Sequence, residues 1–118
     1  MTIRYSDNGL WVQKAGNEYT LGLSIKGQDD LGEVMFVDLT DTAATIEKNE
    51  TLIGVEAAKA VTELTAPFAG KLVKKNEGLS ENPEALNSTD FSENWIAVLS
   101  DADETEFNAL SEKEPQIG

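Results

Sequence analysis

The sequence has neither cysteine nor histidine among its 118 residues. Their absence excludes disulfides, zinc sites built from these side chains, thiol nucleophiles and acid–base catalysis by imidazole. Basic residues are few, at 9 against 22 acidic residues, and the formal net charge is −13. This balance is opposite to that of proteins that bind nucleic-acid phosphates or anionic membrane surfaces. Whatever chemistry the protein takes part in must use other side chains or another molecule.

Long hydrophobic runs are also missing. No apolar segment approaches the roughly 18 residues of a membrane span, and the first residues lack the pattern of a signal or transit peptide. We therefore expect a cytosolic protein. Residues 77–118 carry 11 acidic residues and one lysine, which is typical of a solvated surface that keeps a protein monomeric. The alternative is a surface that steers a basic partner.

Short apolar segments separated by turn signals predict a mostly β fold. The pair Gly16-Asn17 predicts a hairpin loop, and the run Val34-Met35-Phe36-Val37 is typical of a strand buried on both faces. The length fits one domain, which we place at residues 1–112, followed by a frayed tail at 113–118. The expected strands are 10–14, 19–23, 34–37, 51–55, 60–65, 70–74 and 95–99.

Two stretches favour helix. Pro83–Asn87 is long enough for only a turn or two, whereas residues 102–111 predict a C-terminal helix with Phe107 on its buried face. Ser100 and Asp103 have the spacing of a capping box before that helix. The segment 28–32 is expected to be a break between strands.

The segment around Lys59 is the one that suggests chemistry. Strand-like residues on both sides predict a tight turn at Ala57–Ala60, which presents one lysine between alanines, with Glu56 and Glu63 nearby. Such an amine is unhindered, and its four-carbon stem can carry a cargo. Taken alone, the pattern fits a solubilising turn lysine better, because a motif without context is weak.

The context of Lys59 is a series of motifs in a characteristic order. They are Trp11-Val12, the segment 28–37, Glu56-Ala57-Ala58-Lys59-Ala60, Thr62-Glu63, Ala66-Pro67, Gly70-Lys71-Leu72-Val73, Asn76-Glu77-Gly78-Leu79, Asn82-Pro83-Glu84, Leu86-Asn87 and Asn94-Trp95-Ile96. In this order and spacing the chain resembles the H proteins of the glycine cleavage system, from Leu10 to Leu110.

The resemblance implies a barrel-sandwich hybrid of two small antiparallel sheets, with short helices and a C-terminal helix. It implies a lipoyl group in amide linkage on Lys59, and it makes Glu56 and Glu63 candidate recognition residues. H proteins are non-catalytic carriers. We expect this chain to be a monomer in the bacterial cytoplasm. The partners of H proteins are glycine decarboxylase, aminomethyltransferase, dihydrolipoyl dehydrogenase, and a lipoate ligase or lipoyltransferase. A carrier whose sulfurs arrive with its cofactor is consistent with a chain that has no cysteine.

The chain departs from the family at three places. Asn8-Gly9-Leu10 stands where a histidine is usual, Ala57-Ala58 replaces Ser-Val, and residues 24–27 replace Thr-Asp-Tyr-Ala. Two alternatives stay open: an H-like protein that stores or relays lipoate, and an unmodified regulatory interaction domain. A biotin carrier would have methionines beside Lys59, and a 2-oxoacid dehydrogenase lipoyl module would show Asp-Lys-Ala and Ala/Pro-rich linkers.

Overall fold

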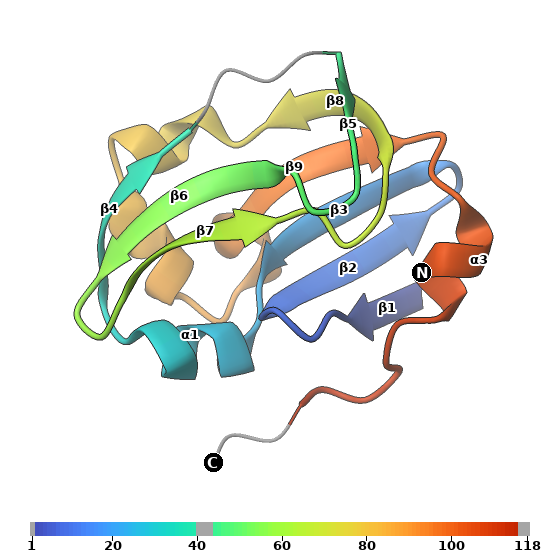
Figure 1. Cartoon of the computed structure of the whole chain (residues 1–118). Helices are drawn as coiled ribbons and strands as arrows, with labels where there is room; N and C mark the ends of the chain where they lie inside the picture. Colours follow the sequence, from blue (N-terminus) through green and yellow to red (C-terminus); the bar gives the residue numbers. More distant parts are fainter. Residues whose placement is uncertain (1, 40–43, 116–118) are drawn as a thin grey trace.

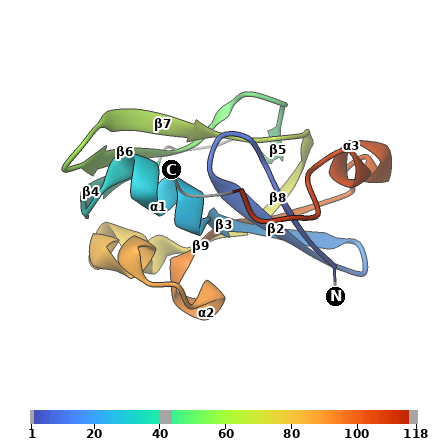
Figure 2. The ribbon, with the colours of Figure 1, turned by 90° about the horizontal axis from the view of Figure 1, so that it is seen from below.

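The computed structural model describes residues 2–39 and 44–115. Its strands form two antiparallel sheets, which stack as two layers with the hydrophobic core between them (Figures 1 and 2). The larger sheet has the order β1-β2-β3-β9-β8-β5, and the smaller one has the order β4-β6-β7. The strands are β1 (Thr2–Tyr5), β2 (Leu10–Ala15), β3 (Glu18–Leu23), β4 (Val34–Asp38), β5 (Thr45–Ile46), β6 (Thr51–Ala57), β7 (Val61–Thr65), β8 (Gly70–Lys75) and β9 (Trp95–Ser100). The predicted mostly β architecture of two antiparallel sheets is confirmed.

The centre of the larger sheet is β9, which pairs with β3 on one side and with β8 on the other. Its segment 96–99 is buried throughout, and Ile96 and Leu99 are fully buried. The neighbouring hairpin joins Ala15 to its partner Glu18, so that the two residues Gly16 and Asn17 form the predicted loop. A positive φ of 62° at Gly16 explains why a glycine stands there.

In the smaller sheet, β4 is an edge strand. The prediction that its apolar run is buried on both faces is wrong, because Met35 is 43% exposed and Phe36 is 63% exposed. Val34 pairs with Ala57, but the next pair is Phe36 with Glu56. The extra residue makes a β-bulge, which interrupts the alternation of side chains between the two faces.

Helix α1 (Ile25–Leu31) lies where the sequence suggested a break between strands, so that expectation is wrong. Ser24 caps its start, because the Ser24 hydroxyl accepts a hydrogen bond from the Gly27 N–H at 3.1 Å. Gly32 ends the helix with a positive φ of 74°. The segment 28–32 is therefore the last turn and cap of a helix.

The C-terminal helix α3 (Glu104–Asn108) is shorter than predicted. It begins after Asp103, whose carboxylate accepts a hydrogen bond from the Thr105 N–H at 2.8 Å, so the expected cap at Ser100 is wrong. Ser100 instead ends β9. Phe107 is buried, as predicted.

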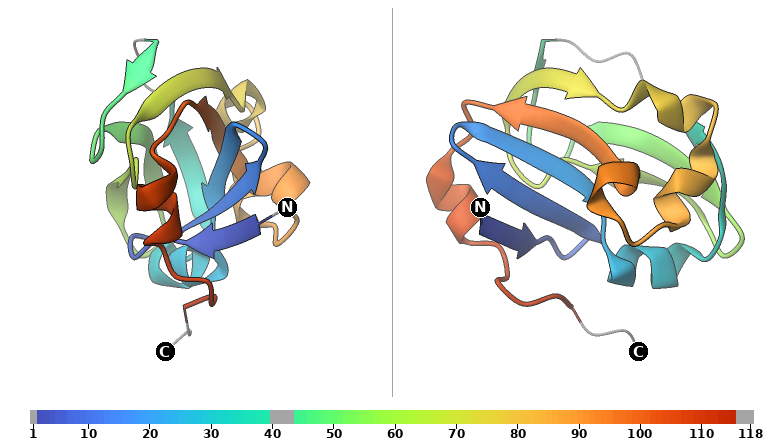
Figure 3. Two further views of the ribbon diagram at one scale, coloured as in Figure 1. Left: turned by 90° about the vertical axis from the view of Figure 1, so that its right-hand side faces the viewer. Right: turned by 180° about the vertical axis from the view of Figure 1, so that it is seen from behind.

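Three further short elements follow β8: the 3-10 helices η1 (Glu77–Ser80) and η2 (Pro83–Asn87), and helix α2 (Phe91–Asn94). The 3-10 helices pack beside β4, where the Asn87 side chain accepts a hydrogen bond from the Val34 N–H at 2.9 Å, whereas α2 lies on the outer side of the larger sheet (Figures 2 and 3). Phe91 stacks on Trp11 with ring centroids 3.9 Å apart and ring planes 6° apart. The Trp11 indole N–H donates to the Asn94 side chain at 2.8 Å. These contacts bury Trp11 on a face of the sheet that would otherwise be open. Within residues 2–39 and 44–115, no helix is long and apolar enough to cross a membrane.

Candidate functional site

Lys59 lies on the turn that joins β6 to β7, as the sequence predicted. Strand β6 ends at Ala57 and β7 begins at Val61, and the Ala57 N–H donates to the Ala60 carbonyl at 2.9 Å across the turn. The Lys59 side chain is exposed. Its neighbours in the chain are alanines, so little side-chain bulk surrounds the amine.

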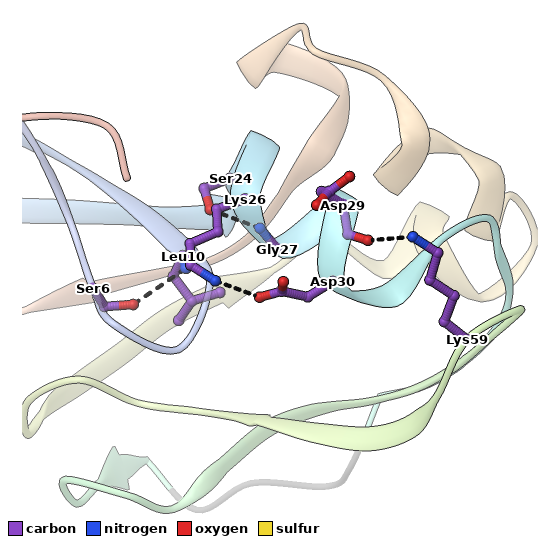
Figure 4. Close-up of polar contacts among 8 residues, drawn as sticks. All are labelled: Ser6, Leu10, Ser24, Lys26, Gly27, Asp29, Asp30 and Lys59. Carbon is purple, nitrogen blue, oxygen red and sulfur yellow. Dashed lines mark hydrogen bonds and ion pairs between the residues drawn. The ribbon is translucent and has the colours of Figure 1, made fainter. Parts of the chain in front are cut away.

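The turn is held in place by the connection between α1 and β4. The Lys59 N–H donates to the Leu31 carbonyl, and the Ala58 N–H donates to the Glu33 carbonyl, both at 2.9 Å. At the end of the side chain, Lys59 Nζ donates to the Asp29 carbonyl, also at 2.9 Å (Figure 4). The backbone that carries the amine is therefore anchored to the rest of the protein, although the amine itself is exposed.

Gly32 lets the lysine stem lie against this connection. A Cβ at Gly32 would lie 3.1 Å from Lys59 Cγ and 3.5 Å from the Ala58 Cβ. The site residues contributed by α1 and its cap were missed from the sequence. The signal that could have found them is Ser24, a typical N-cap residue, followed eight residues later by Gly32, a residue typical of a helix C-terminus.

The environment of Lys59 differs from that of several other lysines. Lys26 Nζ lies 2.8 Å from the Asp30 carboxylate (Figure 4), and that hydrogen bond raises the pKa of Lys26. Lys48 and Lys71 form ion pairs with Glu106 and Asp101 at 3.7 and 3.3 Å. Lys59 donates to a neutral backbone carbonyl instead. An exposed amine on a small-residue turn fits a residue that accepts an acyl group in amide linkage.

Glu56 and Glu63 lie on the same face of the smaller sheet. Glu56 pairs with Val61 in the last pair before the turn, and Glu63 pairs with Gly54 further along the hairpin. Both carboxylates are exposed. Gly54 and Glu56 lie on the outer face, because Val55 between them is buried on the inner face, and Glu63 lies on the same face as its partner Gly54. The structure thus brings the two predicted recognition residues together beside the Lys59 turn. Among the described residues, no group of three or more acidic side chains is arranged to hold a metal ion.

Comparison with known proteins agrees with this architecture. The family model described as glycine cleavage H-protein matches residues 3–116. A glycine cleavage system H protein of Bacillus cereus is 42% identical over 113 residues, which are 94% of this chain and 89% of that protein. Those of Bacillus cytotoxicus and Bacillus anthracis are 41% identical over the same shares of both chains.

Among solved structures, the H protein of Mycobacterium marinum has the same fold, with a TM-score of 0.72 and 22% identity over 85% of this chain and 84% of that one. The family match and the identity to curated relatives extend over nearly all of the chain. The chain therefore belongs to the glycine cleavage H-protein family, whose members are non-catalytic carriers with a covalently attached lipoyl group and interact with the other components of the glycine cleavage system.

Proposed function

We propose that Lys59 is the residue to which the lipoyl group is attached. The observation that supports this is an exposed amine at the end of a hairpin whose backbone is anchored by the hydrogen bonds from Ala58 and Lys59. An enzyme can reach such an amine without unfolding the sheet. A fixed turn also gives the attached arm a defined origin.

Attachment needs little from the chain besides Lys59. The amine attacks the carbonyl carbon of an activated lipoyl group, such as an acyl adenylate. A C–N bond forms as the bond to the AMP leaving group breaks, and the nitrogen releases a proton to water. The hydrogen bond from Nζ to the Asp29 carbonyl is exposed, so it can be exchanged for contacts with an enzyme at small cost. When bound, the lipoyl group supplies the dithiol–disulfide chemistry that a chain without cysteine lacks.

The proposed role is to carry an aminomethyl group from glycine decarboxylase to aminomethyltransferase, with dihydrolipoyl dehydrogenase as the third partner, in the bacterial cytoplasm. The protein acts as a monomer, and a lipoate ligase or lipoyltransferase modifies it. The amide bond keeps the arm attached to the protein while it visits each active site, which raises its effective concentration there. Glu56 and Glu63 are proposed to be recognised by these enzymes.

The proposed folded unit is residues 1–112. Its support is that the segment after α3 returns to the first strand: Tyr5 and Ser111 exchange backbone hydrogen bonds at 2.8 and 3.1 Å. The Arg4 guanidinium also lies 3.1 Å from the Glu112 carboxylate. The proposed tail is residues 113–118, of which 116–118 lie outside the residues that the structure describes.

Lipoylation by a lipoate ligase with lipoate and ATP tests the proposed attachment. Intact-mass measurement should show one lipoyl amide on the wild-type protein and none on Lys59→Arg. Lys26→Arg is the matched control, because Lys26 is a neighbouring lysine on α1, and this variant should be modified like the wild type. A lipoyl adduct that persists in Lys59→Arg, or never forms on the wild type, would contradict the proposal.

Reconstitution of the glycine decarboxylase reaction distinguishes a carrier role from the storage or relay of lipoate. The modified protein, mixed with glycine decarboxylase, should support release of carbon dioxide from glycine and its exchange with bicarbonate. Full modification without any such exchange would favour storage or relay of lipoate.

A further inference from the structure

The outer face of the smaller sheet carries an open apolar groove. Its volume is about 380 Å³, and it runs across β4, β6 and β7. Two of its lining residues are large, exposed hydrophobic side chains: Phe36 is 63% exposed and Val61 is 79% exposed. Exposed apolar surface gathered in one groove with a polar rim is typical of a surface that another molecule covers.

Gly54 lines this groove, in the central strand of the smaller sheet. The fold does not require a glycine at this position. Gly54 has no positive φ, and an added Cβ would make only an ordinary contact, 3.5 Å from the Asp38 Cβ. Glycine in a strand interior weakens the strand, and it often marks a place where another molecule approaches closely.

The charge of the groove selects the kind of molecule that fits it. Asp38, Glu56 and Glu63 lie along it, and no lysine or arginine is among the described residues that line it. A second copy of this chain is a poor occupant, because a two-fold contact through this face would bring the same carboxylates together. An anionic membrane is disfavoured for the same reason. In the register of the sheet, Glu56 stands between Phe36 and Val61, whereas Gly54 stands between Asp38 and Glu63. The complementary surface is that of a basic protein with an apolar side chain that can lie over Gly54, beside Phe36 and Val61.

The position of the groove indicates which kind of protein binds there. The pair Glu56–Val61 is the last pair before the Lys59 turn. The other face of the hairpin is closed, because Val55 and Ala57 are buried in the core and the turn backbone is bonded to the α1–β4 connection. An enzyme that brings the Lys59 amine into its active site therefore has the outer face as its adjacent open surface.

We propose that the groove formed by Phe36, Gly54 and Val61, together with the carboxylates of Asp38, Glu56 and Glu63 that line it, is the docking surface for the enzyme that acylates Lys59, through a basic surface bearing an apolar side chain. This inference rests on the proposed function of Lys59. It assigns the binding of that enzyme to an apolar contact assisted by charge.

Initial rates of lipoylation by a lipoate ligase, followed by intact mass at varied concentrations of this protein, separate binding from chemistry. The double variant Phe36→Thr/Val61→Thr keeps residues that suit strands and should raise KM about tenfold with little change in kcat, as expected for loss of an apolar anchor. Glu63→Gln should raise KM about threefold at low salt, and this difference should shrink at high salt.

Matched controls come from the other sheet. Val73 is also an exposed strand valine, at 45% exposure, and Glu18 is an exposed strand glutamate. Val73→Thr and Glu18→Gln should keep the wild-type KM. Far-UV circular dichroism and thermal unfolding identify any variant that fails to fold. If the double variant does not fold, the single variant Val61→Thr, which changes a largely exposed side chain, replaces it in the KM measurement.

The outcomes distinguish the two proposals. A wild-type KM in the folded groove variants overturns the docking surface and leaves Lys59 as the acceptor. A wild-type protein that is never modified contradicts the attachment proposal itself. A wild-type protein that dimerises in size-exclusion chromatography, with groove variants that are monomeric, assigns the groove to a second copy and also overturns the docking proposal.

Discussion

Two continuous apolar runs of this chain have opposite environments: Val34-Met35-Phe36-Val37 in β4 and Ile96-Ala97-Val98-Leu99 in β9. All four residues of the β9 run are buried, whereas two of the four in β4 are large exposed side chains. The sequences of the two runs alone do not distinguish them. Their positions in the two sheets do.

The two positions differ in what lies beside and above each strand. Strand β9 has a partner on both sides, and α2 lies on the outer face of its sheet, where Phe91 stacks on Trp11. Strand β4 is at the edge of the smaller sheet, and among the described residues no helix lies on the outer face of that sheet (Figure 2). The docking surface proposed above accounts for the difference, because a carrier must leave a face open for the enzyme that modifies it.

The largest effect that tests this comparison is on stability. Ile96→Ala removes a fully buried side chain and should lower the free energy of unfolding by about 2–5 kcal/mol. Phe36→Thr changes a side chain that is largely exposed and should lower it by less than about 1 kcal/mol. Urea unfolding of both variants measures the difference. Equal losses would show that the β4 face is as tightly packed as the core.

A smaller effect should come from the polar contacts beneath α2. The Asn94 side chain accepts from the Trp11 indole N–H and donates to the Leu23 and Ser88 carbonyls, at 2.8, 3.2 and 2.8 Å. Asn94→Ala leaves the buried Trp11 indole N–H without its acceptor, although the Ser88 carbonyl still accepts from the Gln28 side chain at 2.7 Å, and this loss should cost about 2 kcal/mol.

The matched control for Asn94 is Asn17, whose amide donates to the Asp101 carboxylate at 2.6 Å on the surface. Asn17→Ala should cost less than about 0.5 kcal/mol, because water replaces an exposed partner. If urea unfolding gave equal losses for the two asparagines, the contacts beneath α2 would contribute no more than a surface contact.

The features that the sequence predicted are local ones. Alternating apolar residues and turn signals located the hairpin at Gly16-Asn17 and the turn that carries Lys59, because each depends on residues that are neighbours in the chain. The family resemblance added the fold and the carrier role. Glu56 and Glu63 were placed near Lys59 by spacing alone, and the hairpin register puts them on one face.

The features that the sequence did not predict depend on distant contacts. The Asp29 carbonyl that receives Lys59 Nζ is 30 residues away along the chain, so no local pattern connects the two. The bulge at Met35 depends on how β4 pairs with β6, and this pairing decides that Phe36 is exposed. Apolar composition predicts a strand, but burial on both faces requires a cover that another part of the chain must supply.

The smallest effect that we predict is a dependence of the α2 cover on acid pH. The Ser92 hydroxyl, at 2.7 Å, and the Ser92 backbone N–H, at 2.9 Å, donate to the Asp90 carboxylate at the start of α2. These hydrogen bonds, that of the hydroxyl first, lower the pKa of Asp90 below its ordinary value of 3.8. Because the folded pKa is the lower one, the stabilisation is complete above the ordinary value and is lost as the pH falls through the folded pKa.

Substitution of Asp90 should therefore flatten the pH dependence of stability in acid. The free energy of unfolding of Asp90→Ala should fall less than that of the wild type when the pH is lowered below about 4. Ser92→Ala, which keeps the backbone donor and loses the hydroxyl, should give an intermediate slope. Thermal unfolding across this pH range measures all three proteins. Parallel curves for the three would mean that α2 covers Trp11 without any contribution from the charge of Asp90, and that packing of Phe91 and the contacts of Asn94 hold the cover in place.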